Sequence, residues 1–227
     1  MTLRMLVAAR NGVSPIEMDI RHLIIAGWAG RDTEAMEHHI RELEALGVPR
    51  PKETPTFYRV AATRLTVADR IEALGTASSG EAEPVMFAHD GALYVGVGSD
   101  HTDREAETHG VALSKQMCDK PISDTVWPFS EVEDHWDELI LRSWRIDGDR
   151  RDLYQEGKVS DLLTPADLIE RYTGGKSLAD GTAMFGGTLP AIGGIRSAGR
   201  FECELEDPVL SRSITLGYNI ATLAVAG

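Results

Sequence analysis

The sequence predicts a predominantly β protein of the α+β class with a few short helices. Two runs near the C-terminus, Phe201–Leu205 and Ile214–Leu223, alternate with the period of two that a half-buried strand requires. Glycine pairs at 186–187 and 193–194 supply the tight turns between strands. The chain has 227 residues, of which 42% are hydrophobic. This is enough for a real core and excludes wholesale disorder.

Strands are expected along most of the chain. A buried strand over residues 23–26 ends at Gly27, and clear alternation follows in residues 83–87 and 93–97. The segments expected to contain strands, in order, are residues 3–26, 57–99, 139–146, 201–205 and 214–223.

Four segments carry helical patterns. The first, Glu34–Leu46, follows Asp32 or Thr33 as N-cap and stops at Gly47 and Pro49. The last begins Thr-Pro-Ala-Asp, with proline at the first helical position. The expected helices lie over residues 34–46, near 68–73, near 105–117 and over 164–172. We expect residues 1–30 to form a short β extension packed on a main domain of residues 31–227, as one structural unit.

The charge of the chain limits its partners. With 23 Lys and Arg against 36 Asp and Glu, the net charge is -13, which argues against nucleic acid or an anionic membrane surface. No apolar run is long enough for a membrane span or a signal peptide. Cys118 and Cys203 cannot form a disulfide framework or a complete thiolate zinc site. We expect a soluble cytoplasmic protein.

A histidine and a glutamate lie one turn apart on the first expected helix. His39 falls inside the apolar stripe of that helix, His38 points to the other side, and Glu42 is placed to meet His39. A carboxylate that holds an imidazole makes it a better general base. The alternative is an ordinary His–Glu pair that supports the helix.

Three acidic residues could gather around a cation. Glu81 and Glu83 lie two apart in an expected strand and project from one face, which is unfavourable unless a cation lies between them. Asp100, where a strand passes into a helix, could complete an all-oxygen site for Mg²⁺ or Mn²⁺. The alternatives are a solvated acidic turn and a charged first helical turn. Histidines at positions 89, 101 and 109 match no familiar zinc spacing.

In this order, the motifs resemble those of the fumarylacetoacetate hydrolase superfamily, over residues 31–222. The family's His-x-x-Glu and Glu-x-Glu are similar to residues 39–42 and 81–83, and its Asp-x-Thr-Ala-Arg-Asp to residues 100–105. Later motifs resemble residues 114–117, 155–160 and 180–193. The chain looks like a divergent bacterial branch, catalogued as a domain of unknown function. It departs from the family in the short spacing from Glu83 to Asp100, in Glu107 at a glutamine position, and in Leu189 between Thr188 and Pro190.

The resemblance implies an FAH-like mixed β-roll or sandwich and a homodimer. It also implies an enzyme that cleaves a C–C bond in a 2,4-dioxo acid, a small-molecule oxo acid of the acylpyruvate kind. Glu81, Glu83 and Asp100 would hold Mg²⁺, or else Mn²⁺ or Ca²⁺. The resemblance further implies His39, Glu42 and Lys115 as catalytic residues, and as substrate-binding residues Arg104, Gln155, Gly187 and Thr188.

The same site could serve other reactions. A 2-oxo acid decarboxylase, a tautomerase and a sugar-acid dehydratase remain alternatives, as does a metal-dependent binding protein without turnover. The His39–Glu42 pair favours hydrolysis, whereas Glu107 in place of glutamine favours the alternatives.

Overall fold

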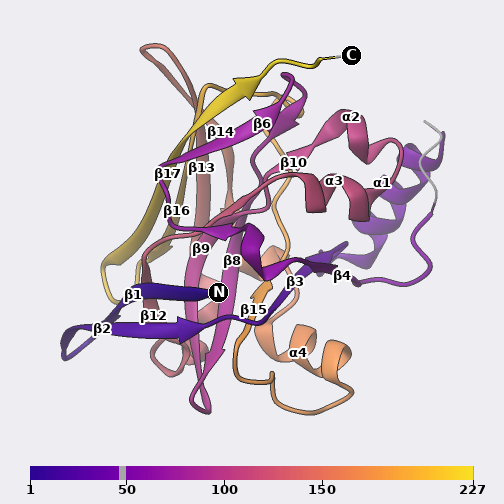
Figure 1. The fold of residues 1–227 in the computed structure, drawn as a ribbon. Helices are drawn as coiled ribbons and strands as arrows, with labels where there is room; N and C mark the ends of the chain where they lie inside the picture. The colour runs from indigo at the N-terminus through magenta and orange to yellow at the C-terminus, as the bar shows by residue number, and fades with distance from the viewer. Residues whose placement is uncertain (46–49, 227) are drawn as a thin grey trace.

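The fold, taken from a computed structural model, is described for residues 1–45 and 50–226 (Figure 1). Within α1, the side chains of residues 35, 39, 42, 43 and 45 also lie outside the description. The described residues form two large sheets and a few short helices, so the predicted α+β class is confirmed. None of the described helices is long and apolar enough to span a membrane.

The larger sheet has eight strands and the smaller has five. The order in the first is β2 (Gly12–Asp19), β1 (Thr2–Ala9), β12 (Thr125–Pro128), β9 (Ala92–Ser99), β8 (Ala82–His89), β15 (Thr182–Phe185), β3 (His22–Gly27) and β4 (Thr56–Val60). The order in the second is β14 (Arg150–Lys158), β13 (Ile140–Asp147), β16 (Arg200–Asp207), β17 (Arg212–Leu223) and β6 (Arg70–Leu74). Two short pairs join β10 (Thr102–Asp103) to β7 (Ser78–Ser79), and β11 (Lys120–Pro121) to β5 (Leu65–Thr66).

The two sheets pack face to face across a common core. Val95 and Val97 of β9 share one buried cluster with Leu141 of β13, Phe201 of β16 and Tyr218 of β17. The predicted alternation in the C-terminal strands is therefore real, because one face of each is buried against the larger sheet. The first 27 residues supply three strands of that sheet, and β3 pairs in parallel with β15. The boundary near residue 30 stays a prediction.

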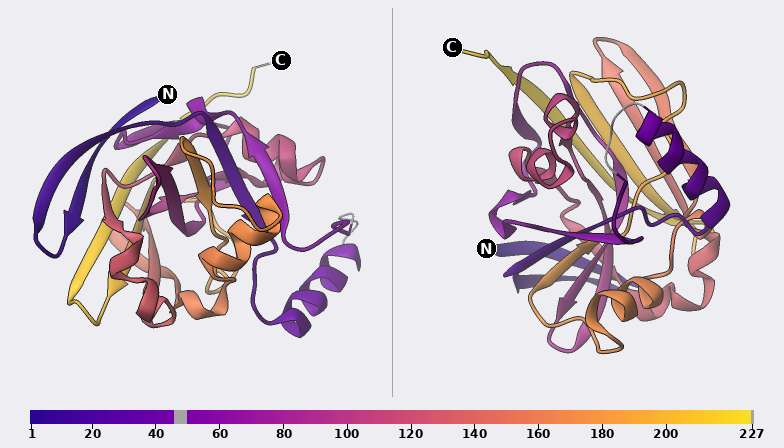
Figure 2. Two further views of the ribbon diagram at one scale, coloured as in Figure 1. Left: turned by 90° about the horizontal axis from the view of Figure 1, so that it is seen from below. Right: turned by 90° about the vertical axis from the view of Figure 1, so that its right-hand side faces the viewer.

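Over residues 1–45 and 50–226, four α-helices lie outside the sheets: α1 (Thr33–Ala45), α2 (Arg104–Glu107), α3 (Val111–Met117) and α4 (Pro165–Thr173). Leu168 of α4 packs on Ile24, Met86 and Met184 of three neighbouring central strands. In both views of Figure 2, α1 stands at the periphery of the molecule. The predictions of α1 and α4 are confirmed, including proline at the first helical position of α4, where Thr164 is the N-cap.

Two helix predictions need correction. The helix expected near residues 68–73 is wrong: residues 70–74 form β6, which pairs in parallel with β17. Ile71 and Ala73 are buried while their neighbours are exposed, so packing of the alternating side chains favours a strand over a helix here. The helix expected near 105–117 is divided into α2 and α3: the first ends at Glu107, with Thr108 as its C-cap, and the second begins after Gly110.

Candidate metal centre

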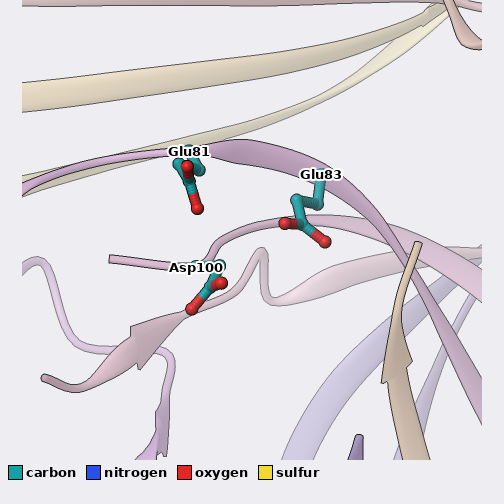
Figure 3. A group of neighbouring side chains, drawn as sticks. All are labelled: Glu81, Glu83 and Asp100. Atoms are coloured by element: carbon teal, nitrogen blue, oxygen red, sulfur yellow. The ribbon is translucent and has the colours of Figure 1, made fainter. Parts of the chain in front are cut away.

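The open end of the β8–β9 hairpin brings three carboxylates together (Figure 3). Ala82 at the start of β8 pairs with Ser99 at the end of β9, and the Asp100 N–H donates to Glu81 O at 2.9 Å. One oxygen from each of Glu81, Glu83 and Asp100 lies within 4.8 Å of the others. Glu83 and Asp100 are buried and Glu81 is half-buried. The predicted convergence is therefore observed.

Three cationic side chains surround the cluster. Lys115 forms a short ion pair with Asp100, and its Nζ lies 3.6 Å from Glu81 Oε2. Arg104 Nη2 lies 3.0 Å from Glu81 Oε1. Lys120 is fully buried, with Nζ 3.2 Å from Asp100 Oδ1 and 2.5 Å from the carbonyl oxygen of His101, to which it donates. Sequence reasoning missed Lys120, since nothing local distinguishes it from a surface lysine.

Burial and neighbouring charges shift the pKa values of Glu83 and Asp100 in opposite directions. Burial and the neighbouring Asp100 charge hold the pKa of Glu83 well above its ordinary value. Burial also opposes ionisation of Asp100, but Lys115 and Lys120 lower its pKa overall. Burial would lower the pKa of Lys115, yet Asp100, Glu81 and Glu83 raise it, so this ammonium stays charged. The site thus holds a buried acid that favours its proton when no further cation is present.

The donor set fits a hard divalent ion. Oxygen ligands from carboxylates are those preferred by Mg²⁺, Mn²⁺ and Ca²⁺. Oδ1 of Asp100 is buried and accepts no hydrogen bond, although the Lys120 ammonium is near. A buried carboxylate oxygen without a hydrogen bond costs free energy, which a coordinated cation would offset.

A glycine-rich turn adjoins the carboxylates. The Gly187 N–H donates to Glu83 Oε2 at 2.8 Å, and Thr188 Oγ1 donates to the carbonyl oxygen of Ala82 at 2.8 Å. Gly187 has a φ of +95°, and a Cβ there would lie 2.7 Å from that of Ala29. Only glycine therefore lets the turn lie this close to the segment that follows β3.

Glu81 and Glu83 open into one large cleft of about 1180 Å³, whereas Asp100 lies behind them and is absent from its lining. Its lining includes eight described residues that the sequence singled out: Glu81, Glu83, Arg104, Glu107, Lys115, Gln155, Gly187 and Thr188. Gln155 is nearly fully buried at the inner wall and donates to Thr188 Oγ1 at 2.8 Å. Glu107 Oε2 lies 3.0 Å from Arg104 Nη1. The roles of these residues toward a substrate stay predictions.

His39 and Glu42 fall within the range of α1, but their side chains lie outside the described residues. Met36 of the same helix lines the cleft, and Ile40 is buried. The predicted base and its carboxylate partner therefore stay predictions.

The model of a family described as "Protein of unknown function (DUF2848)" matches residues 26–218. None of the curated proteins compared with the chain matches its sequence significantly.

Solved structures of the fumarylacetoacetate hydrolase kind share the fold. The yeast protein ynq8, a fumarylacetoacetate hydrolase family protein, is 17% identical with a TM-score of 0.61, over 90% of this chain and 94% of that chain. A 2-keto-3-deoxy-D-arabinonate dehydratase complexed with magnesium and 2,5-dioxopentanoate is 14% identical with a TM-score of 0.64, over 95% and 78%. A 5-carboxymethyl-2-hydroxymuconate delta-isomerase from Mycobacterium smegmatis is 15% identical with a TM-score of 0.63, over 98% and 100%. The resemblance in sequence motifs thus extends to the fold.

Proposed function

The chain belongs to the DUF2848 family, and from that premise we propose a divalent-metal-dependent enzyme that hydrolyses a C–C bond of a small 2,4-dioxo acid. The observation that carries the proposal is the cluster of Glu81, Glu83 and Asp100 beside a buried, charged Lys115 in a large cleft. A neighbour of the same fold was solved with magnesium and 2,5-dioxopentanoate, which supports a 2-oxo acid as the substrate class. We also propose a cytoplasmic homodimer.

In this proposal, one group of residues binds the metal and another binds the substrate. Glu81, Glu83 and Asp100 would hold Mg²⁺, with Mn²⁺ or Ca²⁺ as alternatives. The ion, when bound, supplies a Lewis acid that polarises the 2-oxo group. Lys115, which balances the charge of Glu81 and Asp100, would offer its ammonium to the substrate carboxylate once a bound metal shared that charge. Arg104, the Gly187–Thr188 turn and Gln155 set the shape of the substrate site.

The proposed hydrolysis needs a base for water. His39, held by Glu42, would take a proton from a water molecule as the oxygen attacks the distal carbonyl. The bond between that carbonyl carbon and the neighbouring CH₂ breaks, and its electron pair passes to the pyruvate-like fragment as an enolate. One proton then restores the keto form. One water and one acylpyruvate give one carboxylic acid and one pyruvate.

A second group of reactions is favoured by one observation. Glu107 occupies a position where hydrolases of this fold are expected to carry a glutamine, and it pairs with Arg104 at 3.0 Å. The Glu107 carboxylate is held by Arg104, so it is not placed to position a water molecule as the neutral amide of a glutamine would be. Tautomerisation, decarboxylation or dehydration of a 2-oxo acid is therefore the alternative.

The experiment is an assay of the purified protein with Mg²⁺ and a panel of acylpyruvates, other 2-oxo acids and sugar acids. Release of pyruvate that stops when EDTA is added and resumes with Mg²⁺ supports hydrolysis. Solvent deuterium entering C3 without pyruvate release identifies a tautomerase, and release of CO₂ identifies a decarboxylase. Loss of water from a sugar acid identifies a dehydratase. Binding without turnover of any of these compounds contradicts an enzymatic function.

A further inference from the structure

Beyond the carboxylates, the walls of the cleft are mostly apolar. Side chains from separate segments contribute to this surface: Trp28, Met36, Tyr58, Leu162, Leu189 and Ile195. Trp28 has a φ of +57°, a conformation rare for a bulky residue and found where surrounding structure or a ligand site requires it. A surface of this kind favours an apolar group over a hydrated one.

Each cation that lines the described part of the cleft is already paired. Arg31 makes two 2.8 Å hydrogen bonds to Asp137 and a third, at 3.1 Å, to the carbonyl oxygen of Leu162. Arg104 forms ion pairs with Glu81 and Glu107 and donates a hydrogen bond to Ser79. Lys115 lies against the metal-site carboxylates, where it can serve only a substrate carboxylate held beside the metal.

Arg196 directly follows Ile195 of the cleft lining in sequence, but its side chain turns to the backbone of its own loop. Arg196 is absent from the described lining, and its guanidinium donates to the carbonyl oxygen of Ile192 at 2.7 Å. The cleft lining carries five acidic side chains, two of them Asp32 and Asp161, against three basic ones. A divalent ion and Lys115 would face the first substrate carboxylate, whereas a second, distal carboxylate would meet only lining cations that are already paired.

We infer that the substrate is a monocarboxylic 2-oxo acid whose distal group is apolar. The carboxylate and oxo group lie at the metal centre, and the apolar group lies against the wall formed by Leu162, Leu189 and Ile195. The inference rests on the proposed function, since it takes the three carboxylates as the metal site. It excludes substrates with a second, distal carboxylate.

Two isosteric 2-oxo acids test the inference by calorimetry with the full chain in Mg²⁺. 5-Methyl-2-oxohexanoate and 2-oxoglutarate differ only in a terminal isopropyl group against a carboxylate. The first should bind at least tenfold more tightly. Equal or tighter binding of 2-oxoglutarate would overturn the inference.

Oxalate separates this inference from the proposed function, because it can occupy a metal centre without reaching the distal wall. Mg²⁺-dependent oxalate binding together with a preference for 2-oxoglutarate rejects only the apolar distal group. Failure of oxalate to bind in Mg²⁺ rejects the metal centre, and both proposals fail with it.

A matched pair of variants locates the distal wall. Ile195 lines the cleft, whereas Ile192, on the same loop, is absent from its lining, and both are exposed. Ile195→Arg should raise the affinity for 2-oxoglutarate at least tenfold and leave oxalate binding unchanged. Ile192→Arg should change neither. An Ile195→Arg protein with the original preference would overturn the assignment of the wall.

Discussion

Gln155 holds the backbone of Ala82, the residue between Glu81 and Glu83: its Oε1 accepts the Ala82 N–H at 3.0 Å. The same oxygen accepts from Ser143 at 2.7 Å, and its Nε2 donates to the carbonyl oxygen of Leu189 and to Thr188 Oγ1. One amide therefore fixes the metal-site strand to the glycine-rich turn across two sheets. Its hydrogen-bonding capacity is used within the protein, which makes Gln155 a positioning residue.

Gln155→Ala should lower both stability and Mg²⁺ affinity. The substitution leaves buried partners without a hydrogen bond, each at a cost of about 1–3 kcal/mol. We expect urea unfolding to show a loss of about 3 kcal/mol. Mg²⁺ titration at low temperature should show weaker binding by the folded fraction. The control is Gln116→Ala, which removes a single exposed hydrogen bond accepted from the Ala61 N–H. It should change neither the stability nor the Mg²⁺ affinity. Unchanged Mg²⁺ affinity in a folded Gln155→Ala protein would leave the residue a purely structural role.

Glu83→Gln should separate metal binding from folding. The variant loses a charged ligand, so Mg²⁺ should bind at least tenfold more weakly, a change of about 1.4 kcal/mol. In EDTA its unfolding free energy should be no lower than that of the wild type. Burial disfavours the Glu83 charge, and a glutamine oxygen can still accept from Gly187. Glu105→Gln, on the exposed first turn of α2, is the matched control. Wild-type Mg²⁺ affinity in Glu83→Gln would contradict the assigned site.

The position of the carboxylates was predictable because it depends on short-range geometry. Residues two apart in a strand share a face, which places Glu81 beside Glu83. Asp100 needed one further step, the pairing of two alternating segments as β8 and β9. A period of two is present in both segments, so this step was within reach of sequence reasoning.

The buried partners of the site were not predictable in this way. Lys120 reaches Asp100 only because α2 and α3 return the chain to the hairpin, and no periodicity encodes that path. His101 Nδ1 lies at hydrogen-bond distance, 3.0 Å, from Oη of Tyr218, a residue 117 positions further along the chain. Residues 70–74 became a strand because β17 offered a free edge, which is a tertiary effect.

His101 predicts a dependence of stability on pH. Burial, with Lys120 and Arg104 adding to it, lowers the pKa of His101 from 6.5 to about 3. Between these values the unfolded chain binds a proton that the folded chain does not, so stability is lost as the pH falls. The slope from this group is about 1.4 kcal/mol per pH unit.

Comparison with His101→Gln isolates that contribution. The raised pKa of Glu83 acts in the opposite direction, since its stabilisation is lost as the pH rises, but it is common to both proteins. Between pH 6.5 and 5, in EDTA, the wild type should lose about 2 kcal/mol more than the variant in chemical unfolding. Parallel profiles for the two proteins would show that His101 is protonated in the folded state.

The last prediction concerns the proposed base. His39→Ala should slow acylpyruvate hydrolysis by about 100- to 10,000-fold, the usual contribution of a general base. Mg²⁺ affinity should hardly change, because Glu81, Glu83 and Asp100 are the residues that would hold the metal. His38→Ala is the matched control, since the helical stripe turns position 38 to the exposed side of α1, where His38 is observed. Glu42→Gln should cost less than His39→Ala, because an amide oxygen still orients the imidazole while the charge that raises its basicity is lost. A His39→Ala protein that hydrolyses at the wild-type rate would exclude this mechanism. Loss of hydrolysis with retained exchange of the C3 protons would instead assign water activation to His39 and enolisation to the metal centre.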